Sequence, residues 1–70
     1  MVVKEDRPTA RQQAEALARM LREAAREAQL DVHRVDGPKA QALFETVRDV
    51  LNGTIKALDD YAREREVAWQ

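Results

Sequence analysis

The sequence predicts an all-α protein: an antiparallel two-helix hairpin that dimerises into a four-helix bundle. Three observations lead to this prediction. Gly and Pro occur only twice each among 70 residues, and the abundant Ala, Glu, Arg and Leu favour helices. Apolar residues recur at helical spacing along two stretches of the chain. Between them, Asp36-Gly37-Pro38 is typical of a turn that leads into a new helix.

The length and composition allow one helical domain, residues 1–70, and exclude several classes of protein. The chain contains no cysteine, which excludes disulfides and cysteine-based metal sites. No apolar run is long enough to span a membrane, and the charges that directly follow Met1-Val2-Val3 do not fit a signal peptide. We therefore expect a cytoplasmic protein.

The first helix is predicted over about residues 10–30, after an irregular lead-in formed by residues 1–8. Thr9 and Gln12 stand at the spacing of a capping box, in which each side chain accepts a hydrogen bond from the other residue's backbone N–H. Apolar residues then recur at intervals of 4, 3, 4, 3 and 4, which is a heptad pattern. The residues of this predicted seam are Ala10, Ala14, Leu17, Leu21, Ala24 and Ala28, widened by Met20, Ala25 and Leu30.

Residues 31–37 are expected to form the connection, and the second helix is predicted over about residues 38–67. Its apolar seam consists of Ala40, Phe44, Val47, Leu51, Ile55, Leu58 and Ala62, flanked by Leu43, Val50, Thr54 and Tyr61. Asn52-Gly53 could end this helix and give a three-helix bundle instead. A turn there would reset the apolar phase, yet Leu51 and Ile55 keep it, so we favour a continuous helix.

Two helices of these lengths predict a dimer. At 1.5 Å per residue they span about 31 and 45 Å, so the end of the second helix would extend beyond the first. A hairpin also encloses no core, and chains below about 80 residues rarely gain enough stability from a single core. We therefore expect a second copy to cover the exposed apolar residues. The expected partner or dimer interface comprises Leu17, Leu21, Phe44, Val47, Leu51, Ile55, Leu58, Tyr61 and Trp69.

Few residues suggest chemistry. His33 is expected to be an exposed loop residue, and the carboxylate pairs Glu45/Asp49 and Asp60/Glu64 lack the Glu-x-x-His motifs that accompany them in bundle metal sites. We expect no metal, no cofactor and no catalytic activity. A basic strip on the first helix could contact phosphate groups, but acidic residues are interleaved with it, so nucleic-acid binding is not favoured. The residues of this strip are Arg19, Arg22 and Arg26.

The leading functional hypothesis is a small non-enzymatic protein–protein interaction module that acts as a homodimer. It could serve as an adaptor, a chaperone-like protein or an antitoxin-like regulator, with another protein docking on the C-terminal part of the second helix. Two alternatives remain open: a nucleic-acid-binding regulator that uses the arginine strip, and a structural subunit of a larger complex.

Overall fold

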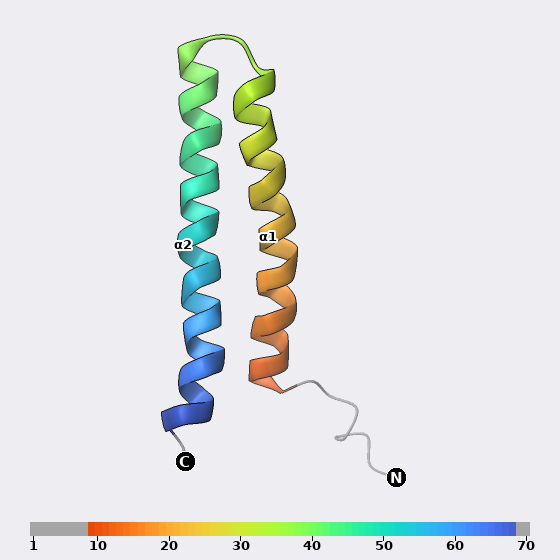
Figure 1. Ribbon diagram of the computed structural model, residues 1–70, viewed down its shortest axis with the longest axis vertical. Helices are drawn as coiled ribbons and strands as arrows, with labels where there is room; N and C mark the ends of the chain where they lie inside the picture. The colour runs from red at the N-terminus through yellow and green to blue at the C-terminus, as the bar shows by residue number, and fades with distance from the viewer. Residues whose placement is uncertain (1–8, 69–70) are drawn as a thin grey trace.

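The computed structural model describes the backbone of residues 9–68 and the side chains of residues 9–63. Two helices, α1 (Ala10–Arg34) and α2 (Pro38–Ala68), run antiparallel and side by side, joined by one tight loop (Figure 1). The described residues contain no strand, so the predicted all-α hairpin is confirmed. The predicted lead-in at residues 1–8 lies outside the described part of the chain.

The start of α1 agrees with the prediction. Thr9 has extended backbone angles, and its side-chain oxygen accepts a hydrogen bond from the Gln12 N–H at 3.0 Å. The Gln12 side chain accepts one in return from the Thr9 N–H at 2.9 Å. The capping box therefore satisfies two backbone donors that the first helical turn cannot pair.

The end of α1 lies four residues later than predicted, at Arg34. Val32, which is only 8% exposed, continues the buried side of the helix, so extending the helix buries another apolar side chain. His33 and Arg34 in the last turn also favour the helix, because cations stabilise its negative C-terminal end. The connection is therefore residues 35–37, where Gly37 has a φ of 98°, a conformation that favours glycine.

Helix α2 continues through Asn52-Gly53, so the three-helix alternative is wrong. Thr54 does not cap a new helix: its hydroxyl donates to the carbonyl of Val50 at 2.9 Å, as happens inside helices. A glycine in a helix costs about 1 kcal/mol relative to alanine. That cost is smaller than the stability that would be lost if a break after Leu51 misaligned the apolar contacts of α2 with α1.

The buried side of α1 is a row of small residues that differs from the predicted seam. Leu17 is 46% exposed, and Ala10 and Ala24 are also exposed. In the row that contacts α2, Ala18 and Ala25 take the places predicted for Leu17 and Ala24, which directly precede them in the sequence. It consists of Ala14, Ala18, Ala25, Ala28 and Val32, which are buried, and Leu21, which is partly buried. Small side chains in this row let the two helices lie close together.

The corresponding row on α2 is buried at Ile55 and Ala62. Phe44, Leu51 and Leu58 are partly buried, whereas Val47 is exposed and does not belong to this row. Since Ala62 is buried, α1 covers α2 further towards its C-terminus than predicted. The longer α1 explains this difference, because four added residues lengthen it by about 6 Å.

Candidate protein-interaction surface

Helix α2 carries a second apolar row, and this one is exposed. Apart from Val47, which precedes Arg48, each member precedes a residue of the buried row, and the members follow one another at intervals of 4, 3, 4, 3 and 4. Leu43 is 58% exposed and Val50 61%. This spacing is the heptad pattern typical of a helix that packs against another helix, and within the hairpin the row stays exposed. The row is Leu43, Val47, Val50, Thr54, Ala57 and Tyr61.

Helix α1 adds apolar residues to the same side of the hairpin. Leu17, Met20 and Ala24 each precede a residue of the row that packs against α2, and all three are exposed. The side chain of the preceding residue points in a direction rotated by about 100° about the helix axis, and this rotation has the same handedness in both helices. Because α1 and α2 run antiparallel and face each other, the rotation brings both exposed rows to the same side of the hairpin. We call these residues, together with the exposed row of α2, the apolar face.

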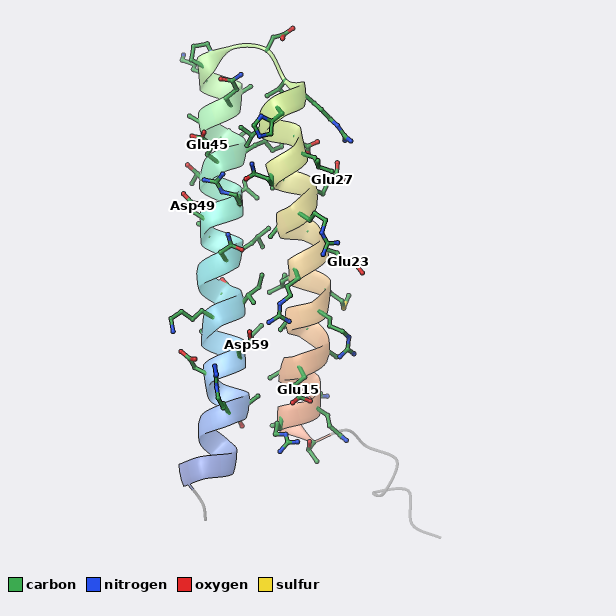
Figure 2. The ribbon with its side chains drawn as sticks, viewed as in Figure 1. Glu15, Glu23, Glu27, Glu45, Asp49 and Asp59 are labelled. Carbon is green, nitrogen blue, oxygen red and sulfur yellow. The ribbon has the colours of Figure 1, made fainter. Side chains whose placement is uncertain are left out.

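The apolar face extends along α2 but covers only the N-terminal half of α1. Further along, the equivalent positions on α1 hold Glu27 and Asp31. Figure 2 shows Glu27 and Glu23 on the side of α1 that points away from α2. The face is therefore asymmetric, with its continuous apolar part on α2.

The opposite side of the hairpin is polar and carries side-chain interactions that join the two helices. Arg22 of α1 forms an ion pair with Asp59 of α2, and Figure 2 shows Asp59 on the side of α2 towards α1. Arg48 of α2 donates from Nη1 to Gln29 Oε1 of α1 at 2.6 Å. Charge-assisted hydrogen bonds of this kind are stronger than neutral ones, so they help to fix which faces of the helices meet.

A shallow groove of about 300 Å³ lies on this polar side. Of the predicted basic strip, Arg22 and Arg26 line the groove and Arg19 does not. The prediction missed Arg48, which comes from the other helix and whose side chain is 29% exposed. Asp59 neutralises Arg22, and Asp49 lies 3.0 Å from Arg48. The groove therefore has a small excess of positive charge. Its remaining lining residues are Ala25, Gln29 and Asn52.

The other candidate chemical groups lie apart. His33 belongs to the last turn of α1 and not to a loop as predicted, and its Nε2 lies 3.1 Å from Gln29 Nε2. Asp60 pairs with Lys56 at 3.0 Å and Arg63 at 3.3 Å, and these cations lower its pKa. Among the residues with described side chains, no group of three His, Cys, Asp or Glu could hold a metal ion.

The predicted interface residues divide into two groups. Leu21, Phe44, Leu51, Ile55 and Leu58 lie on the sides where α1 and α2 meet. The second group lies on the apolar face: Leu17, Val47 and Tyr61. Trp69 lies outside the described residues. The sequence indicated the face through Val50, Thr54 and Tyr61 as flanking residues, but did not separate it from the seam.

Comparisons with known proteins add no relative. The sequence matches no protein-family model, no curated protein and no solved structure. Neither helix, as far as the structure describes it, has a stretch that is apolar and long enough to cross a membrane.

Proposed function

We propose that the protein is a small protein–protein interaction module that acts as a homodimer, in which two hairpins pair through their apolar faces to form a four-helix bundle. The observation that carries this proposal is the exposed heptad row of α2, which has the spacing of a helix contact but no partner within the hairpin. Such a module would serve as an adaptor, a chaperone-like protein or an antitoxin-like regulator.

The energetics of the hairpin support pairing. Within the described part, no large side chain is fully buried, and five of the seven buried hydrophobic residues are alanines. At about 25 cal/mol per Å² of buried apolar surface, alanine side chains contribute little each. Two hairpins stacked on their apolar faces would enclose larger side chains such as Leu43 and Val50. The polar side would remain in water.

Substitution of Val50 by lysine tests this proposal. Val50 is 61% exposed in the hairpin, so Val50→Lys leaves the hairpin folded. In the paired form, the ammonium group would enter an apolar contact at a cost of roughly 3 kcal/mol or more. We expect the dimer dissociation constant, measured by sedimentation equilibrium, to rise at least about 100-fold.

Glu45→Lys provides the matched control, because Glu45 is an exposed residue of α2 outside the apolar face. This variant should keep the oligomeric state of the unmodified protein. A well-folded unmodified chain that stays monomeric at high micromolar concentration would contradict the proposal. Equal dissociation constants for Val50→Lys and the parent dimer would show that another surface mediates association.

Nucleic-acid binding is a second candidate function, favoured by the way Arg48 joins Arg22 and Arg26 around one groove. Guanidinium groups from two helices could contact neighbouring phosphates. Two of these three arginines are already paired with aspartates, so we rank this function below the interaction module. A subunit of a larger complex, the third candidate, would use the apolar face for a different chain.

A further inference from the structure

We infer that two copies pack antiparallel along α2, with their loops at opposite ends of the bundle and the two-fold axis between Val50 and Thr54. This inference rests on the proposed homodimer and specifies its contact and orientation. It follows from the exposed row of α2, which is the continuous part of the apolar face.

The exposed row is complementary to itself when it is reversed. Its members lie symmetrically about position 52, so an antiparallel copy places Leu43 opposite Tyr61 of the other copy. The same reversal places Val47 opposite Ala57 and Val50 opposite Thr54. Val47 thus meets the smaller Ala57, and pairing a larger with a smaller side chain is how helix interfaces fill their space.

The parallel alternative fits this row less well. With both loops at one end and α2 beside α2, every residue would meet its own copy. Ala57 would then meet Ala57 and leave space, while two Tyr61 rings would compete for one layer. The helix dipoles would also point the same way, whereas antiparallel helices place opposite ends together.

A third arrangement stacks α2 of one copy on α1 of the other, again with the loops at one end. Arg48 lies beside Gln29 in the hairpin, so the Val47 end of α2 is level with the part of α1 that carries Glu27 and Asp31. Stacking would press these carboxylates against Val47 and Val50, and burying unpaired charges is costly. Contact between the two α2 helices keeps both carboxylates away from Val47 and Val50.

Gly53 is consistent with an axis at this position. A Cβ atom added to Gly53 would meet nothing within 4 Å, so the hairpin itself does not require glycine there. Gly53 lies beside the midpoint of the exposed row, where two antiparallel helices would approach each other. A residue without a side chain leaves room for the other backbone at that point.

Disulfide trapping tests the orientation, because the chain has no cysteine of its own. Two single variants, Leu43→Cys and Tyr61→Cys, are mixed in equal amounts, allowed to exchange subunits and mildly oxidised. We expect a disulfide between position 43 of one variant and position 61 of the other, identified by mass spectrometry of proteolytic fragments. Leu43→Cys alone should stay uncrosslinked, because its two copies would lie about 27 Å apart, beyond disulfide reach.

A spin-label measurement gives a second, independent readout. Labels on Lys39→Cys, next to the loop, should be about 40 Å apart in the antiparallel dimer. A crosslink between two copies of position 43, or labels within about 25 Å, would overturn the inference in favour of loops at one end. A dimer with no crosslink between 43 and 61 would also overturn it. Monomeric variants before oxidation, together with a monomeric parent, would contradict the homodimer itself.

Discussion

Single polar residues determine how the two helices of this hairpin meet more than they determine its stability. Most of the ion pairs in the described part are largely exposed, such as Arg11 with Glu15 and Arg34 with Glu27. Exposed pairs contribute at most about 1 kcal/mol each. Arg22 with Asp59 differs in function because it joins α1 to α2. Its loss would weaken the preference for one rotation of the helices about each other.

Asp60 gives a prediction at the residue scale. Its pKa is lowered below the usual 3.8, first by the hydrogen bond from Lys56 and then by the charges of Lys56 and Arg63. Stability from this carboxylate is therefore present above pH 3.8 and is lost as the pH falls through the lowered pKa. An NMR titration of the Asp60 carboxyl carbon should give a pKa below 3.8, and Lys56→Met should raise it.

Arg63→Met is the comparison for this titration, because Arg63 acts on Asp60 more weakly than Lys56 does. It should raise the pKa of Asp60 by less than Lys56→Met. A pKa that does not change in Lys56→Met would show that the Lys56–Asp60 hydrogen bond does not persist in solution.

At the scale of the elements, the close approach of α1 and α2 depends on the alanine row. Ala18 is 0% exposed and lies in the cluster with Ala25 and Ile55. Ala18→Leu adds three carbon atoms at this contact and must move the helices apart or force poor side-chain conformations. Overpacking of this kind typically costs 1–3 kcal/mol. We expect urea unfolding followed by circular dichroism to show a loss of about that size.

Ala42→Leu is the matched control, since Ala42 is exposed on α2 and lies outside both of its apolar rows. Leucine and alanine have similar helix propensities, so this variant should unfold within about 0.5 kcal/mol of the parent protein. If Ala18→Leu were as stable as Ala42→Leu, the close contact at Ala18 would not exist in solution.

The elements also show which features the sequence could predict. Local signals sufficed to place the start of α1 directly after Thr9 and to predict the continuity of α2 through Gly53. The packing row of α1 could not be chosen, because alanines occupy two neighbouring rows and periodicity alone does not separate them. The end of α1 was missed because Asp31 and His33 suggest a loop, whereas burial of Val32 against α2 favours another turn of helix.

The candidate surface was predictable only in part, because periodicity alone does not determine how each helix is rotated about its axis. Val47 and Tyr61 were expected at an interface, and they lie on the apolar face. Leu43 and Val50 were assigned only as flanking residues, and Arg48 was not connected with Arg22. Pairs of residues from two helices become neighbours only when the rotation of each helix is known, and side-chain contacts between the helices fix that rotation.

At the scale of the whole molecule, the hairpin is one layer of helices, with its Cα atoms spanning only 12 Å along the shortest axis. A single layer cannot enclose a core, since stable domains pack at least two layers against each other. The two sides of this layer differ: one is apolar, and the other carries the ion pair and the arginine groove. Stacking a second copy on the apolar side would supply the second layer. The arginine-lined groove of each copy would then face outwards.

This arrangement leads to a prediction about nucleic acids. The whole chain has a net charge of −1, and Asp59 and Asp49 offset the arginines of the groove. Without a broad positive field, contacts with phosphates release few counterions and give little affinity. We therefore expect RNA and DNA oligonucleotides to bind more weakly than about 100 µM at 150 mM salt, measured by fluorescence anisotropy.

Oligonucleotide binding by an arginine variant distinguishes the two leading functions, the interaction module and nucleic-acid binding. If the groove does bind phosphates, affinity should fall steeply between 50 and 150 mM salt and be lost in Arg26→Gln, which changes no residue of the apolar face. Val50→Lys would keep such binding in each separate hairpin. Tight binding with this pattern would make nucleic-acid recognition the main function. Its absence, with an intact dimer, would leave the apolar face as the functional surface of the molecule.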